Sequence, residues 1–153
     1  SIASGGRVAV FATGRLESVK ASVEEAAVAS RAAAELDAVC VVSRPDPHVL
    51  SCFAGRAEGR TIKLGTAMGL IETKTTVGLV KAVDEMLKAA DVTYEGKHKV
   101  GNFLTAAVVR GDVEAVRAAL DVGSQEATAI GELVSAHEIA YPYAELQERL
   151  PHR

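Results

Sequence analysis

The stretch that decides the fold is TAAVVRGDVEAVRAALDVGSQEATAIGELVSAHEIAYPYAELQ, residues 105–147, because residues 8–50 repeat it without a gap at a spacing of 97 positions. Nine of the 43 aligned positions are identical. The matched pairs include Gly14 and Gly111, Glu17 and Glu114, Val19 and Val116, Ala21 and Ala118, Glu35 and Glu132, and Pro45 and Pro142. The matched Gly, Glu and Pro fall at the turn after a strand, the first helical turn and a strand exit. The repeated unit is therefore a strand, a helix and a strand.

The two copies differ in completeness. A strand and a helix over residues 68–90 precede the repeated stretch in the second copy, and their counterparts would fall before residue 1. By this repeat, about 30 residues of the first copy are absent from the sequence. Unpaired strand edges and an uncovered helix face invite pairing with another chain. We therefore expect a natural product longer than this chain, or a neighbouring subunit that completes the first copy.

Apolar patterning predicts the elements of both copies. In the first copy it predicts a strand at 8–12, a helix at 16–36, a strand at 38–43 with Cys40 as a buried thiol, and a linker at 51–65. In the second copy it predicts strands at 67–71, 92–100, 104–110 and 136–139, helices at 77–90 and after residue 112, and a short helix at 145–150. Asp112 is expected to cap its helix by accepting amide N–H groups through its carboxylate, whereas Arg15 at the equivalent position cannot.

Composition excludes several classes of function. The net charge is −3, aromatic residues make up 4% of the chain and there is no Trp. The chain therefore lacks both an excess of positive charge to neutralise phosphates and aromatic side chains on which bases could stack. Nucleic-acid binding is disfavoured. No apolar run approaches the roughly 20 residues of a membrane span, and no leader pattern follows Ser1, so we expect a cytoplasmic protein. The histidines, acids and two cysteines show no ligand spacing, which predicts no metal site and no cofactor.

Four blocks of the second copy carry a family resemblance. They are GLIETK at Gly69–Lys74, DEMLKAADV at Asp84–Val92, VRGD at Val109–Asp112, and GELVS at Gly131–Ser135 followed by Pro142. In this order they resemble the shell domain of bacterial microcompartments (the BMC domain). The resemblance implies an α+β, two-layer fold in which helices flank an antiparallel sheet. Residues 1–50 would be the C-terminal half of a first domain, and residues 66–153 would be a complete second domain.

The resemblance extends to the tandem type of shell protein, in which three chains form a pseudohexameric tile. Such tiles join edge to edge around enzymes and have a central pore. Lys88 matches the family's tile-edge lysine, and Arg44 before Pro45 matches an arginine that supports edge packing. Tyr141 before Pro142 departs from that pattern. From its residue type alone, Lys88 also fits an ordinary solvated helix lysine.

The family's pore turn matches a second set of residues. Gly101, Asn102 and Phe103 align with that turn, and Ser4, Gly5 and Gly6 are their counterparts in the first copy. Glycine lets backbone approach a symmetry axis closely, although an ordinary turn between strands would suit the same residues. Lys97, His98 and Lys99 would give the rim positive character that favours anionic solutes.

Two functions are compatible with these observations. The first is a non-catalytic shell protein that assembles with itself as a homotrimer or hexamer, with other shell proteins and with enclosed enzymes, and whose pore admits small metabolites. The second is a small α/β regulatory module that binds a ligand between its two copies, an analogy from fold alone. An enzyme is disfavoured because no nucleophile and base, or acid and base, can be assembled from the sequence.

Overall fold

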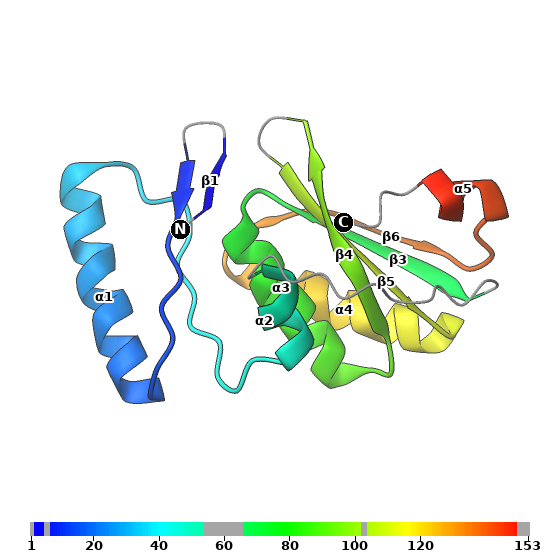
Figure 1. Ribbon diagram of the computed structural model, residues 1–153, viewed down its shortest axis with the longest axis horizontal. Helices are drawn as coiled ribbons and strands as arrows, with labels where there is room; N and C mark the ends of the chain where they lie inside the picture. Colours follow the sequence, from blue (N-terminus) through cyan, green and yellow to red (C-terminus); the bar gives the residue numbers. More distant parts are fainter. Residues whose placement is uncertain (1, 5–6, 54–65, 102–103, 150–153) are drawn as a thin grey trace.

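The computed structural model describes residues 2–4, 7–53, 66–101 and 104–149. Its elements are β1 (Ile2–Ser4), β2 (Arg7–Ala9), α1 (Leu16–Ala33), α2 (Pro47–Phe53), β3 (Ala67–Thr73), α3 (Thr76–Ala89), β4 (Thr93–Val100), β5 (Leu104–Gly111), α4 (Val113–Ala129), β6 (Leu133–Ile139) and α5 (Ala144–Arg149). Everything from β3 onward forms one compact unit, and the β1–β2 hairpin and α1 lie beside it (Figure 1).

The compact unit is built on an antiparallel sheet with the strand order β4-β5-β3-β6. The strand β3 lies inside the sheet, where Gly69 is aligned with Val109 of β5 and with Glu138 of β6. Most residues of this interior strand are buried, and its sequence AMGLI is correspondingly a continuous apolar run. This arrangement confirms the predicted α+β class with an antiparallel sheet and flanking helices.

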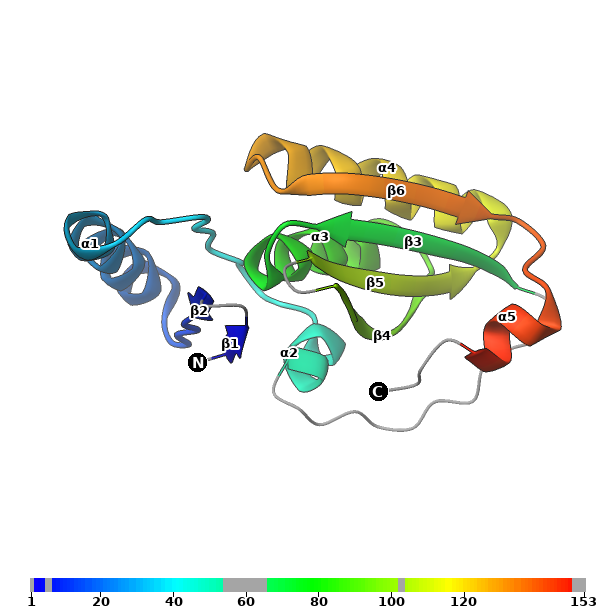
Figure 2. The ribbon, with the colours of Figure 1, turned by 90° about the horizontal axis from the view of Figure 1, so that it is seen from above.

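The helices α3 and α4 cover one face of the sheet and enclose the main core (Figures 1 and 2). The largest buried core side chains include Ile71, Leu79, Met86, Val109 and Val116. Apolar or small residues recur along α4 at Val116, Leu120, Gly123 and Ala127, which places them on one helix face. The short helix α5 lies on the other side of the sheet, above it in Figure 1. The main core therefore lies on the α3–α4 side of the sheet.

Gly123 of α4 lets this helix pack closely against α3. A Cβ atom at this position would lie 2.6 Å from Cγ of Met86 and 2.7 Å from its sulfur. Gly78 of α3 allows a similar approach to the chain before β6, because its Cβ would lie 2.5 Å from Cβ of Glu132. Both glycines are needed for space, since neither has a positive φ.

The helices of the N-terminal region begin at the same repeat positions as those of the compact unit. Helix α1 begins at residue 16 and α4 at residue 113, while α2 begins at residue 47 and α5 at residue 144. Both pairs are separated by the 97 positions of the internal repeat. Burial differs between the copies, however: Val8 and Val10 are 67% and 76% exposed, whereas their counterparts Thr105 and Ala107 are 7% and 0% exposed.

Several predicted elements need correction. The strand expected at 8–12 is limited to β2, which pairs only with the three residues of β1. The strand expected at 38–43 is wrong, because that segment belongs to no sheet. Its counterpart β6 is hydrogen-bonded to β3, and among the described residues no strand takes the place of β3 beside residues 38–43. Without a neighbouring strand to take its backbone hydrogen bonds, the segment has no ladder to join.

The linker boundary and one helix cap also differ from prediction. Helix α2 extends to Phe53, so the predicted linker at 51–65 begins inside a helix, and residues 54–65 lie outside the described residues. Asp112 occupies the N-cap position of α4, but its side chain accepts no capping hydrogen bond. Arg15 likewise makes no side-chain cap, as predicted. In α3 the cap is Thr75, whose side chain accepts a hydrogen bond from the Gly78 amide at 3.3 Å.

We predict that Gly78→Ala lowers the free energy of unfolding by about 1–3 kcal/mol, because the added methyl group overpacks the contact with Glu132. Thermal or urea unfolding followed by circular dichroism measures the change. The matched control is Gly14→Ala, whose added Cβ would meet only Cγ2 of Val19 at an ordinary 3.6 Å. Equal stabilities for the two variants would contradict the prediction.

Candidate functional site

Lys88, the predicted tile-edge lysine, lies in the last turn of α3. Its ammonium group forms an ion pair with Asp84, one helical turn earlier, and donates a hydrogen bond to the Ser43 carbonyl at 3.1 Å. The carboxylate of Glu85 lies 3.8 Å from the same nitrogen. The Lys88 side chain is 33% exposed, whereas that of Asp84 is fully buried. The buried carboxylate of Asp84 therefore holds the ammonium group of Lys88 at the protein surface.

Arg44, the other predicted tile-edge residue, lies in the turn that meets this helix. Residues on both sides of it contact α3: Ser43 accepts from Lys88, and the Asp46 amide donates to Oδ1 of Asp84 at 2.7 Å. Arg44 itself has a φ of +49°, a left-handed conformation that is uncommon for residues other than glycine. The structure thus brings the predicted edge residues of the two copies, 44 positions apart in sequence, onto one helix end.

The C-terminal segment of the first copy, residues 40–49, is called its tail below. The rest of this tail also packs against the compact unit. Val49 of α2 is fully buried in the core formed by α3 and the sheet. Cys40 donates a weak hydrogen bond from its thiol to the Val77 carbonyl at 3.8 Å, so it lies beside the first turn of α3 and not in a strand. Burial raises the pKa of this thiol. The tail therefore follows α3 and anchors at its end.

The predicted pore residues are only partly described. Gly5, Gly6, Asn102 and Phe103 lie outside the described residues. Ser4 ends β1, and Gly101 follows β4 with a φ of +61°, a conformation that suits glycine. The ends of β1 and β4 lie on the same side of the molecule (Figure 1). Ser4 and Gly101, the described members of the two predicted turns, are at these strand ends.

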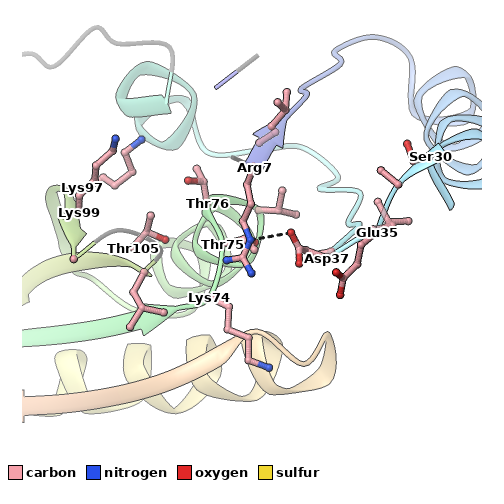
Figure 3. Close-up of a pocket in the computed structure, with 18 residues that line it drawn as sticks. Arg7, Ser30, Glu35, Asp37, Lys74, Thr75, Thr76, Lys97, Lys99 and Thr105 are labelled. Carbon is pink, nitrogen blue, oxygen red and sulfur yellow. Dashed lines mark ion pairs between the residues drawn. The ribbon is translucent and has the colours of Figure 1, made fainter. Parts of the chain in front are cut away.

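A cavity of about 520 Å³ separates the β1–β2 hairpin from the compact unit. Figure 3 shows Arg7 pointing across it to Asp37, with 3.1 Å between Nε and Oδ2. Lys97 and Lys99 lie together on the opposite side, with their ammonium groups directed away from that ion pair. Burial, and secondly the charge of Lys99, lower the pKa of Lys97. The cations around the cavity therefore do not converge on one point.

Sequence reasoning missed two buried carboxylates, Asp84 and Glu132. Glu132 accepts hydrogen bonds from both the amide and the hydroxyl of Thr75, which joins the GELVS block to the start of α3. A signal for Asp84 was present, since an acid four residues before Lys88 shares its helix face. The contacts of Asp84 with the turn at residues 43–46 had no sequence signal.

The part of the chain that the structure describes holds neither a metal-binding cluster nor a membrane-spanning helix. Nowhere in residues 2–4, 7–53, 66–101 and 104–149 do three His, Cys, Asp or Glu side chains gather to hold a metal ion. Within the same described ranges, every helix is too short or too polar to cross a membrane.

Comparison with known proteins assigns the sheet and its flanking helices to a family. The BMC domain family model matches residues 67–142. The microcompartment shell protein EutM of Salmonella typhimurium is 48% identical over 85 residues, which cover 56% of this chain and 88% of EutM. The carboxysome assembly protein CcmO of Synechocystis is 34% identical over 147 residues, covering 90% of this chain but only half of CcmO. A crystal structure of a microcompartment protein from Desulfitobacterium hafniense superposes with a TM-score of 0.68 at 26% identity, covering 88% of this chain and 73% of that one.

The fold and the matches define the class as a structural shell protein. The chain belongs to the BMC-domain family of bacterial microcompartment shell proteins. The family predicted from the four sequence blocks is confirmed, and so is the structural shell role. The alternative of a ligand-binding regulatory module has no support among these relatives.

We predict that Cys40 reacts with an aromatic disulfide reagent more slowly in the folded chain than in the unfolded chain, because burial limits access to the thiol and its raised pKa leaves less thiolate. The measurement uses a Cys52→Ser background at mildly alkaline pH, so that Cys40 is the only thiol. The same variant in denaturant is the control. Equal rates in the two states would show that the tail does not pack on α3 in solution.

Proposed function

We propose that the chain is a non-catalytic tile of a microcompartment shell, built as a pseudohexamer with a central pore for small metabolites. The observation that carries this proposal is the docking of the first copy's tail on α3 of a complete BMC domain, through Val49, Asp84 and Lys88. The partners would be further copies of the chain, other shell proteins and the enclosed enzymes. The location would be the microcompartment shell in the bacterial cytoplasm.

The tandem arrangement is supported by the positions and exposures of the N-terminal elements. Helices α1 and α2 begin at the repeat positions of α4 and α5. Among the residues of α1, Ala27 alone is buried, whereas α4 buries five. Residues 1–50 would accordingly be the second half of a first domain, and a strand and helix like β3 and α3 would cover the apolar face of α1. The alignment with CcmO over 90% of this chain supports the same arrangement.

The pore would be formed where the ends of β1 and β4 lie on one side of the molecule (Figure 1). In this proposal, Ser4, Gly5 and Gly6 from the first copy alternate with Gly101, Asn102 and Phe103 from the second around the axis. The backbone amides and small side chains of such residues can replace part of the hydration shell of a polar solute. Lys97 and Lys99 near the rim would favour anionic solutes.

The tile edge would be formed by Lys88 and Arg44. Both lie at the same end of α3, where the ammonium group of Lys88 remains partly exposed. Cations presented at an edge can donate hydrogen bonds to the backbone carbonyls of a neighbouring tile. Repetition of this contact on every edge would extend tiles into a flat facet.

We predict that Lys88→Gln abolishes the growth of flat sheets but leaves the small oligomer intact, because the amide keeps an N–H donor for Asp84 and loses the edge charge. Negative-stain electron microscopy detects sheets, and sizing with light scattering detects the oligomer. The control is Lys20→Gln, which removes an exposed helix lysine paired with Glu17 at 3.1 Å. Normal sheets from Lys88→Gln would refute the edge role of this lysine.

We also predict that light scattering of the native protein gives a mass corresponding to a trimer or hexamer of the chain. In this proposal, ring closure packs the tail of each domain on its neighbour, as the first copy's tail here packs on α3 through Val49. The denatured mass of the same sample is the reference, and a value above 15.9 kDa would reveal further sequence. A stable monomer would overturn the tile proposal.

A further inference from the structure

A single buried carboxylate, that of Asp84, contacts both Lys88 and the turn that contains Arg44, the two parts of the proposed tile edge. Asp84 lies on the inner side of α3, and its side chain is fully excluded from solvent. A buried charge is costly unless ion pairs and hydrogen bonds compensate for it. Here one oxygen accepts from the Asp46 amide at 2.7 Å, and the other forms the ion pair with Lys88. Each oxygen therefore contacts a different copy of the repeat.

The contacts of Lys88 within the chain leave one N–H donor of its ammonium group for a partner outside the chain. An ammonium group has three N–H donors. One is directed to Asp84 and one to the Ser43 carbonyl, while Glu85 at 3.8 Å is beyond hydrogen-bonding distance. Because two donors are held by these two acceptors, the third is directed away from both of them. A fixed donor on a side chain that is 33% exposed suits a carbonyl acceptor on a neighbouring tile.

The same carboxylate stabilises the unusual backbone at Arg44. A left-handed conformation is unfavourable for a non-glycine residue and persists only when the surroundings hold it. The bonds that hold this turn lie directly on either side of it, at the Ser43 carbonyl and the Asp46 amide. Both lead to the Asp84–Lys88 pair. Release of Asp84 would therefore free the Arg44 turn and the Lys88 side chain together.

We propose that Asp84 is the positioning residue of the tile edge: its carboxylate aims the Lys88 ammonium outward and seats the Arg44 turn on α3. This inference rests on the proposed edge role of Lys88 and Arg44. Asp84 itself, being buried, would make no contact with a neighbouring tile. Its substitution should affect assembly only through the two residues that it holds.

The test compares Asp84→Asn with Glu85→Gln in the full chain. Both variants remove one negative charge near Lys88, and only Asp84→Asn removes the buried partner. Loss of a hydrogen bond to a charged group corresponds to about a tenfold effect or more, so Asp84→Asn should raise the concentration needed for sheet growth by at least about tenfold. Glu85→Gln should assemble like the unchanged chain, and the small oligomer should persist in both variants.

The outcomes separate this inference from the proposed edge role. If Asp84→Asn forms sheets normally while Lys88→Gln does not, the positioning role is wrong and the edge role stands. If neither variant affects sheet growth, the edge role itself is wrong. Loss of sheets in both Asp84→Asn and Glu85→Gln would indicate a general charge effect and would also overturn the positioning role.

A second measurement begins with the unchanged protein, where the result does not depend on the folding of any variant. Hydrogen exchange of the Asp46 amide in the unchanged protein should be slowed at least about tenfold relative to an unstructured chain, because this amide donates to Asp84. Asp84→Ala should remove that protection, whereas Asp84→Asn should retain it through the amide oxygen. An Asp46 amide that exchanges at the unstructured rate in the unchanged protein would overturn the inference.

Discussion

The backbone pairing of β3 is the constraint on which the rest of the structure depends. Buried amide and carbonyl groups must be hydrogen-bonded, and β3 satisfies those of both β5 and β6. In the described N-terminal region no strand takes the place of β3 beside the segments equivalent to β5 and β6. The segment at 36–42, equivalent to β6, joins no sheet, and β2 is limited to three of the eight residues that its counterpart β5 contributes. Similar sequences thus form a full strand or a short one according to the available neighbour.

The same constraint explains the different surroundings of the two long helices. Helix α4 buries its apolar face because α3 and the sheet provide a matching surface, with Gly123 admitting the Met86 side chain. Helix α1 has the same spacing of apolar residues but buries only Ala27. Helical periodicity is a local property and appears in both copies. Burial of the apolar face is a property of the assembled domain.

The tail of the first copy joins the repeat to the complete domain. Val49 contributes an apolar side chain to the core, while Ser43 and Asp46 contribute backbone groups to Lys88 and Asp84. Apolar burial and hydrogen bonding to charged groups act together at this contact, which gives the tail a defined position on α3. The equivalent tail of the second copy has Tyr141 and Tyr143 in place of Arg44 and Asp46, and both tyrosines are more than 80% exposed. The two tails therefore present different chemistry at equivalent positions.

The repeat, the family and most elements from residue 67 onward could be predicted from the sequence, because these depend on local periodicity and on blocks of residues in a fixed order. The sequence also singled out Lys88 and Arg44, although nothing in it placed them near each other. Only the tertiary structure decided that they meet at the end of α3, that Asp84 lies beneath them, and that residues 38–43 form no strand. These features depend on contacts between segments far apart in the chain, and in particular on whether a partner strand or helix is there to make them.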